Sequence, residues 1–422
     1  MWIAADTILT MAGDPLEGHA ILVEDGHIAD ILPIGDVPGD TDVATFTGCI
    51  CHPAFINMHT HLLWSNQRGI GDNLPLPRWI YERVVKAIRE MTEDDKRRGI
   101  ELGISRSYAA GVTTVLESHF ESNVFEAAKE MGMRGIFFLE AFGVYSPVQS
   151  VEVKRVKRAI DAMLEAATSE QRVGFSPHAP YSVTPAILKT LLPWARELGL
   201  PIMTHLAETE EERKYFAEHK GEFAQRMRLF PRKPDLKCAS PVEYYAKYKL
   251  FGPDVFLVHC VDLSTADIEF ISDTGSSVVT CPTSNAKLGC GIAPVVEMID
   301  AGIDVGLGTD SEGSCDEFDM YEEMRRLILF QRGKHSAIPD LDAKSALEMC
   351  TSKAARMAGF KNLGTIERGK AADIVVTAVD AEGVSAQRDP YGRLVWGTHK
   401  SDIRLVLSRG RKVFESGGAD AV

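Results

Sequence analysis

The sequence predicts a (β/α)8 barrel that carries a small β-sandwich domain built from both ends of the chain. In the middle of the chain, short apolar segments alternate with helical segments, which is typical of a parallel α/β fold. Both ends show the pattern of short strands instead. With 422 residues, the chain is long enough for a barrel of about 250 residues and a smaller unit. We therefore expect three segments, 1–50, 51–364 and 365–422, with the barrel in the second.

Eight strand candidates are almost continuously apolar, as expected for parallel strands that helices cover on both faces. They are residues 54–61, 112–118, 135–141, 173–178, 201–206, 255–260, 277–281 and 303–309. Residues typical of helix starts and ends lie between these segments. Thr92 precedes an acidic first turn, Thr184 is followed by proline at the first helical position, and Gly199 closes that helix. Eight such repeats favour a closed barrel over an open sheet.

The terminal segments predict one β unit. Residues 20–28 look like two strands around an Asp-Gly turn, and residues 372–377 and 403–414 have the same character. Two connections, 62–91 and 209–249, are too long for plain turns, so we expect them to cap a site at the top of the barrel.

The composition excludes several classes of partner. A formal charge of −14 repels phosphate backbones and anionic lipid, so neither a nucleic acid nor a membrane is expected as a partner. No apolar stretch approaches the roughly 18 residues of a membrane span, and no signal peptide is recognised. The eight cysteines are scattered, which favours free thiols in a reducing compartment. We expect a cytoplasmic protein.

Metal-binding side chains recur at the predicted strand ends. His59 and His61 lie two residues apart, so both imidazoles face the same way on a strand. His205 and Asp310 end two further strands. An isolated His-x-His pair is more often structural, and Asp310 could instead cap a helix. The barrel context favours a metal site made of these four residues.

Three further residues are candidates for catalysis or substrate binding. Glu208 follows His205 closely enough to exchange a proton with metal-bound water, whereas we expect the neighbouring Glu210–Glu212 to be solvated. His259 could ligate the metal or hydrogen-bond to the attacked atom. His178 is expected to contact substrate, although a packing role fits its spacing nearly as well.

The long first connection and the other strand ends supply weaker candidates. We expect Arg68, Trp79 and Glu140 to contact substrate. Packing is the alternative for Trp64 and Trp79, and a solvent-facing or ion-paired role is the alternative for Glu117 and Glu140.

At these residues the chain resembles the amidohydrolase superfamily, and its nearest branch looks like the 5-methylthioadenosine/S-adenosylhomocysteine deaminases and the triazine chlorohydrolases. The matching stretches are 59–61, 68–69, 176–181, 204–209, 259–260, 281–285 and 306–310. The resemblance implies a mononuclear metal site with His59, His61, His205 and Asp310 as ligands and Glu208 as the proton shuttle. It also implies the β-sandwich from both termini and a homo-oligomer, often a dimer.

The sequence departs from that branch at three places. Ile88 stands where the nucleoside-acting members usually have a ribose-binding carboxylate. Residues 137–142 lack the arginines that would bind a homocysteine carboxylate, and residues 311–316 replace an Asn-rich run.

These observations predict a hydrolytic deaminase of an aromatic N-heterocycle, an adenine-type nucleoside or purine or a related pyrimidine or triazine. Metal-bound hydroxide would attack the carbon that bears the amino group, with Glu208, His259 and Asp310 as catalytic residues. The cofactor is one divalent ion, zinc or alternatively iron. A chlorohydrolase or an alkylamine-releasing hydrolase is the alternative activity, and a non-catalytic binding scaffold is the third hypothesis.

Overall fold

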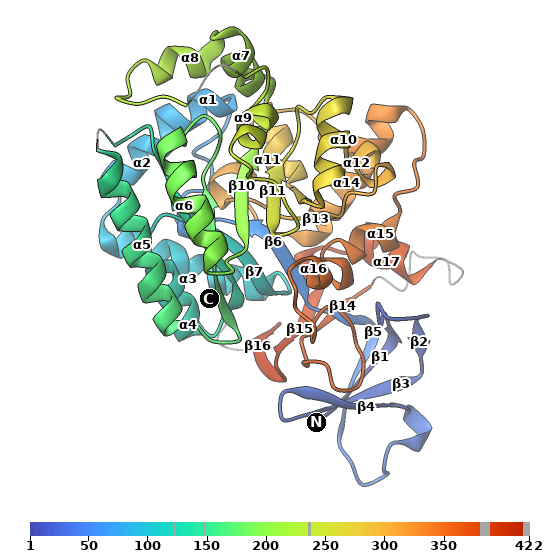
Figure 1. The fold of residues 1–422 in the computed structure, drawn as a ribbon. Helices are drawn as coiled ribbons and strands as arrows, with labels where there is room; N and C mark the ends of the chain where they lie inside the picture. Colours follow the sequence, from blue (N-terminus) through green and yellow to red (C-terminus); the bar gives the residue numbers. More distant parts are fainter. Residues whose placement is uncertain (122, 147, 235–237, 380–388, 417–422) are drawn as a thin grey trace. The chain divides into compact units, whose positions relative to one another are not determined.

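The computed structural model describes residues 1–121, 123–146, 148–234, 238–379 and 389–416. Within these ranges the chain forms two sheets of eight strands each, together with helices (Figure 1). The chain divides into two compact units. One comprises residues 1–57, 105–114 and 318–422, and the other comprises residues 58–104 and 115–317.

One sheet is a nearly closed parallel barrel, with the strand order β13-β12-β11-β10-β9-β8-β7-β6. A parallel bridge between Thr60 and Asp310 links the end of β6 to the end of β13. The backbone N–H groups of Thr309 and Asp310 also donate to the carbonyl of His59. The helices lie outside the strands (Figure 1). The predicted (β/α)8 barrel is therefore confirmed.

The barrel strands are short and almost entirely buried, as their apolar sequences predict. All eight fall on the predicted segments, with ends that differ by at most two residues. Their bounds are β6 Phe55–Thr60, β7 Val112–His119, β8 Arg134–Ala141, β9 Gln171–Pro177, β10 Ile202–Leu206, β11 Val255–His259, β12 Ser277–Thr280 and β13 Val305–Leu307.

Helices separate the barrel strands and form most of the long connections. Thr184 precedes α6 with Pro185 at its first position, as predicted. The helices up to residue 315 are α1 Leu76–Trp79, α2 Val85–Glu90, α3 Glu93–Ala109, α4 Asn123–Met131, α5 Gln149–Ala166, α6 Pro185–Glu197, α7 Glu210–Glu218, α8 Gly221–Met227, α9 Pro241–Lys247, α10 Thr265–Thr274, α11 Pro282–Lys287, α12 Val295–Asp300 and α13 Glu312–Cys315. Later come α14 Met320–His335, α15 Ala343–Glu348, α16 Ser352–Met357 and α17 Pro390–Gly397.

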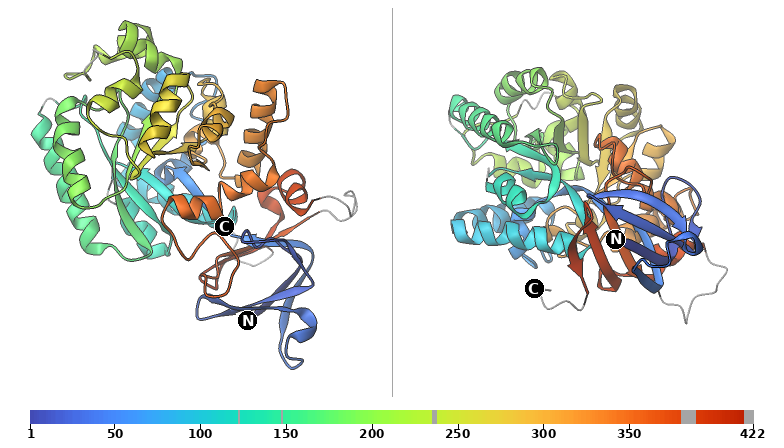
Figure 2. Two further views of the ribbon diagram at one scale, coloured as in Figure 1. Left: turned by 45° about the vertical axis from the view of Figure 1, so that its right-hand side comes forward. Right: turned by 90° about the horizontal axis from the view of Figure 1, so that it is seen from below.

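The second sheet joins both ends of the chain, in the order β16-β15-β14-β5-β1-β3-β4 with β2 beside β1. In Figure 2 its blue N-terminal strands and red C-terminal strands lie side by side. Its bounds are β1 Trp2–Ile8, β2 Leu16–Glu17, β3 His19–Glu24, β4 His27–Pro33, β5 Val43–Pro53, β14 Ile374–Ala378, β15 Ile403–Ser408 and β16 Arg411–Glu415. The prediction of a β unit from both termini is confirmed.

Local sequence explains this sheet. Asp25 and Gly26 connect β3 and β4 and both have positive φ, 47° and 81°, as a two-residue hairpin of this hand requires. A buried apolar cluster that includes Ile3, Ile21 and Val376 packs the strands from both ends of the chain.

All eight cysteines of the chain are free and buried, as predicted.

The two long connections carry structure of their own. The first contains a 3-10 helix η2 (Leu62–Asn66), α1, a π-helix η3 (Ile80–Val84) and α2. The second contains α7, α8 and α9, and its residues 235–237 lie outside the described ranges. Two further 3-10 helices are η1 (Ile34–Asp36) and η4 (Lys400–Asp402). No helix in the described part of the chain is long and apolar enough to cross a membrane.

Candidate metal centre and active site

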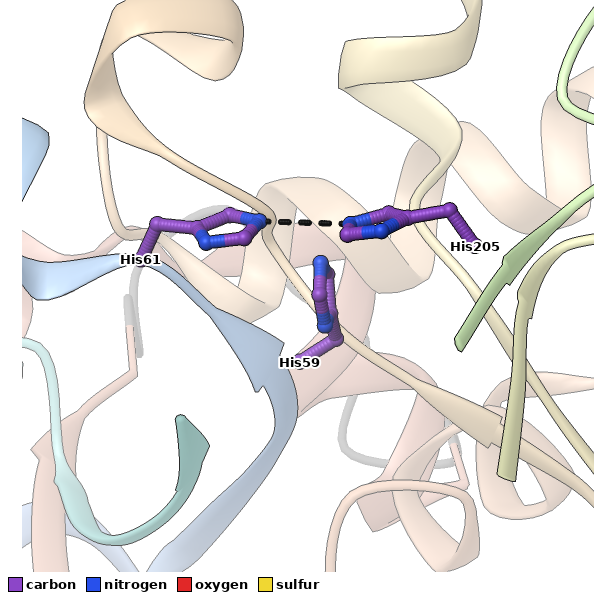
Figure 3. Close-up of side chains that lie close together, drawn as sticks. All are labelled: His59, His61 and His205. Atoms are coloured by element: carbon purple, nitrogen blue, oxygen red, sulfur yellow. Dashed lines mark hydrogen bonds between the residues drawn. The ribbon is translucent and has the colours of Figure 1, made fainter. Parts of the chain in front are cut away.

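Three imidazoles converge at the carboxyl ends of β6 and β10. Ligand atoms of His59, His61 and His205 all lie within 4.8 Å of one another. The Nε2 atoms of His61 and His205 are 3.4 Å apart, and the His59 ring lies between and below them (Figure 3). His59 and His61 share a face because they are two residues apart on one strand.

The outer nitrogen of each ring is fixed by the protein. The Nδ1 atom of His61 lies 2.7 Å from the carbonyl oxygen of Ser118, and that of His205 lies 2.8 Å from the carbonyl of His178. A carbonyl only accepts, so each Nδ1 donates its proton and each Nε2 keeps a lone pair. Two lone pairs 3.4 Å apart repel each other unless a cation lies between them. Metal-binding histidines are oriented in this way, so the donor set fits a metal ion.

Asp310 adds a carboxylate to the three imidazoles. Its Oδ1 atom lies 3.5 Å from Nε2 of His61 and 3.8 Å from Nε2 of His59. Its Oδ2 atom accepts hydrogen bonds from the hydroxyls of Ser284, at 2.5 Å, and Ser314, at 3.0 Å. Three nitrogens and one carboxylate oxygen are a common donor set for zinc or iron.

Burial sets the charge state of these groups. It lowers the pKa of His59 and His205 well below 6.5, and the neighbouring imidazoles lower both values further. Both rings are therefore neutral at physiological pH, and a neutral imidazole is the form that binds a metal.

Glu208 and His259 lie together at the same end of the barrel. Their Oε1 and Nε2 atoms are 3.5 Å apart, and both side chains are almost fully buried. Burial raises the pKa of Glu208 well above 4.5, and the negative charges of Asp310 and Glu212 add to the rise. Nδ1 of His259 lies 2.8 Å from Oδ1 of Asn285, which orients the ring. A buried carboxyl whose pKa is raised in this way can take up a proton and transfer it.

His178 and Glu140 lie beside His205. The rings of His178 and His205 are 4.8 Å apart, and ligand atoms of Glu140, His178 and His205 also lie within 4.8 Å of one another. Oε1 of Glu140 is buried without a hydrogen-bond partner among the described residues. Burial raises the pKa of Glu140 to about 7. Glu140 is thus placed to bind a donor group of a ligand.

A cavity of about 320 Å³ opens from this cluster, which lies in the range of small-molecule sites. It is lined by predicted and unpredicted residues, namely His61, Trp64, Leu76, Trp79, Ile80, Val84, Val85, Ile88, Arg89, Phe120, Glu140, Phe142, Tyr145, His178, Tyr181, His205, Glu208, Phe230, His259, Asp310 and Ser311. Trp79 is among them, whereas Arg68 and Glu117 are not. The guanidinium of Arg68 pairs with buried Glu312, and Glu117 accepts from the backbone N–H of Leu62.

Glu212 is not solvated, so the expectation for Glu210–Glu212 is wrong at its last residue. The side chain of Glu212 is buried, and its Oε2 accepts from the backbone N–H of Glu208 at 3.0 Å. Burial raises its pKa to about 8. The physical reason is that the first turn of α7 directs the side chain of Glu212 back to the backbone of Glu208, close to the end of β10.

Sequence reasoning also missed the residues that hold the site together. Ser284 and Asn285, which follow β12, bind Asp310 and His259. The signal for them is that residues 281–285 are among the stretches that resemble the amidohydrolase superfamily, although no role was assigned to Ser284 or Asn285. Strained backbone is the other missed feature, because His259 and Asp310 have φ of 73° and 65°. Non-glycine residues with such angles cluster at functional sites.

Comparison with known proteins agrees with this geometry. Residues 50–413 match the amidohydrolase family. The chain is 31% identical over 411 residues to a 5-methylthioadenosine/S-adenosylhomocysteine deaminase of Desulforudis audaxviator, covering 96% of this chain and 91% of the relative.

Two solved structures are similar over nearly the whole chain. An adenosine deaminase from Xanthomonas campestris with bound zinc has a TM-score of 0.83 at 25% identity, over 97% of this chain and 92% of the other. An atrazine chlorohydrolase from Arthrobacter aurescens complexed with zinc has a TM-score of 0.81 at 21% identity, over 98% and 95%, which is a likeness of fold. Because the family match spans most of the sequence, the chain belongs to the amidohydrolase family.

Proposed function

We propose that this protein is a metal-dependent aminohydrolase that removes an amino group from an aromatic N-heterocycle, an adenine-type compound or a related pyrimidine or triazine. The observation that carries the proposal is the convergence of His59, His61, His205 and Asp310. The last three of them line one cavity together with Glu208. The relative from Desulforudis audaxviator and the solved Xanthomonas campestris enzyme are both named as deaminases of adenine-type nucleosides, which supports this substrate class.

His59, His61, His205 and Asp310 would hold one divalent cation, and we propose zinc, with iron as the alternative. When bound, such an ion acts as a Lewis acid and makes water a stronger acid. Three imidazole nitrogens and one carboxylate oxygen are donor atoms that suit both metals.

Glu208 would carry the proton through the reaction. Its carboxylate takes a proton from the attacking water, whose oxygen bonds to the ring carbon. The same proton then passes to the amino nitrogen, the C–N bond breaks and ammonia leaves, so that water and the amine become a carbonyl compound and ammonia. Nε2 of His259 lies 3.5 Å from Oε1 of Glu208. A protonated His259 would donate a hydrogen bond from Nε2 to the addition intermediate, whereas a neutral His259 would accept one there.

Glu208 also favours an amine over a halide as the leaving group. A departing amine needs a proton, whereas a halide departs as an anion. Burial raises the pKa of Glu208, which makes its carboxylate a stronger base toward water, and the proton that it takes up is then available to the departing amine. A chlorohydrolase is therefore the second candidate, and analysis of the products from a halotriazine and an aminopurine separates the two activities.

Two broader properties belong to the same proposal. Eight free, buried cysteines are consistent with a reducing cytoplasm. The homo-oligomer, often a dimer in similar proteins, is supported by the family resemblance alone, and light scattering on the purified protein tests it.

The decisive experiment compares Glu208→Gln with Glu210→Gln. Glu210 is exposed and lies in the same acidic run, so its variant is a matched control. We expect Glu208→Gln to lower kcat for ammonia release by about 10²- to 10⁴-fold with unchanged metal content by mass spectrometry. Full activity in Glu208→Gln, or in metal-free protein, would refute the proposal.

A further inference from the structure

We propose that the apolar part of the cavity selects heterocycles that carry an apolar, ring-sized substituent and discriminates against hydroxyl-rich substituents such as sugars. This inference rests on the proposed function, because it concerns the substrate of the same site. This part, called the apolar arm below, consists of lining residues that do not belong to the metal centre, namely Ile80, Val84, Val85, Ile88, Phe142, Tyr145 and Phe230.

One wall of the apolar arm is aliphatic. Ile80, Val84 and Ile88 are spaced by four residues along η3 and α2, so they lie on one helical face, and Val85 lies beside them. All four side chains are half-buried. Because they line the cavity, they present apolar surface to it. The π-helical turn in this segment is a feature often found at functional sites.

A second wall is a chain of aromatic rings that begins beside the metal centre. The ring of His178, next to His205, lies 4.6 Å from that of Phe142. Phe142 lies 5.6 Å from Tyr145, and Tyr145 lies 4.7 Å from Phe230 in an edge-to-face arrangement. The rings therefore lead continuously from the metal centre into the apolar arm. A substituent on a heterocycle bound at the centre would extend along them.

Most ionisable side chains that line the cavity belong to the metal centre or to the groups beside it. Among the seven residues of the apolar arm, Tyr145 alone carries a polar side-chain group, its hydroxyl, and the side chain of Arg89, next to Ile88 in the sequence, is exposed. A substituent with several hydroxyl groups would lose water here and find few partners. Each unpaired hydroxyl weakens binding by roughly tenfold. An aromatic or branched aliphatic group, in contrast, gains by leaving water.

Two matched compounds test this selectivity in the metal-loaded, full-length protein. We expect kcat/KM for ammonia release from 9-benzyladenine to exceed that from adenosine by about tenfold or more. Binding is measured separately with 9-benzylpurine and purine riboside, which have no amino group to release. Quenching of tryptophan fluorescence reports it, because Trp64 and Trp79 line the cavity. Equal or better turnover and binding of the ribosides would overturn the proposal.

Variants locate the selectivity in the apolar arm. Ile88→Glu places an acceptor for hydroxyl groups on the aliphatic wall, so we expect it to reduce the preference for the benzyl compounds by about tenfold, chiefly through KM. Ile88→Gln, without the charge, is the second variant if Ile88→Glu does not fold. Lys86→Glu adds a carboxylate to the exposed face of the same helix and should leave the preference unchanged. An unchanged preference in both Ile88 variants would refute the assignment.

The two proposals fail in different ways. Preferred binding of 9-benzylpurine without ammonia release from any aminoheterocycle would refute the proposed function and leave the apolar arm standing. Efficient ammonia release with a preference for adenosine would support the function and refute the apolar arm.

Discussion

Removing the two serines that hold Asp310 should weaken metal binding without changing any ligand. The hydroxyls of Ser284 and Ser314 both donate to Oδ2, which leaves Oδ1 facing His59 and His61. In Ser284→Ala and Ser314→Ala the carboxylate loses part of this restraint and can rotate away from the imidazoles.

The contacts set the size of the effect. Hydrogen bonds to a charged group contribute about 1.5–3 kcal/mol each. Loss of a residue that orients a metal ligand usually costs about 10- to 100-fold in affinity. The Ser284 bond is the shorter of the two, 2.5 Å against 3.0 Å, so Ser284→Ala should have the larger effect. Because both hydroxyls restrain one oxygen, the double variant should lose more affinity than the two single variants combined.

Competition with a chromophoric chelator at neutral pH measures the affinity for zinc. Ser272→Ala is the control, because Ser272 donates 2.6 Å to the carbonyl of Ala301 and contacts none of the site residues named above. The reasoning would be refuted if the Ser284→Ala/Ser314→Ala double variant bound zinc as tightly as the unaltered protein.

Three further predictions follow from other contacts. In Gly308→Ala the new methyl would lie 2.8 Å from the backbone nitrogen of His59, so the free energy of unfolding should fall by about 1–3 kcal/mol in urea titrations; an unchanged midpoint would contradict this. Chelation should lower Tm and metal should restore it, because the lone pairs of His61 and His205 then face each other at 3.4 Å; an insensitive Tm would argue against a metal site. Burial lowers the pKa of His52 to about 4, below the 6.5 of the unfolded chain, so stability present above pH 6.5 should be lost as the pH falls to 4, by roughly 3 kcal/mol. Unfolding at several pH values should show a weaker dependence in His52→Gln, and an equal dependence would exclude this residue as the cause.

The fold could be predicted from the sequence because the pattern and the structure share one cause. Parallel strands covered on both faces must be apolar, so the barrel strands stand out as apolar segments. The ends of those strands meet at one edge of the barrel, which is why His59, His205 and Asp310 could be grouped although they are far apart in the chain.

Residues whose positions depend on how a helix or loop folds against the rest of the protein could not be predicted. Glu212 belongs to an acidic run, and it is buried because the first turn of α7 directs its side chain back to the backbone of Glu208. Phe142 and Tyr145 follow β8, whereas Phe230 belongs to the long connection after β10, and nothing in their local sequence brings the ring of Phe230 to the other two. The left-handed backbone of His259 likewise depends on surrounding contacts and not on its own preference.

The sheet that joins the two chain ends has a consequence for biosynthesis. Strand β5 lies between β1 and β14, and roughly 320 residues separate β5 from β14 in the sequence. At about 5–20 residues per second, a ribosome needs about 15–60 s to make that stretch. During this time β5 exposes an unpaired edge to other nascent chains. Efficient production of the protein should therefore depend on chaperones that shield the N-terminal strands until the C-terminal ones emerge.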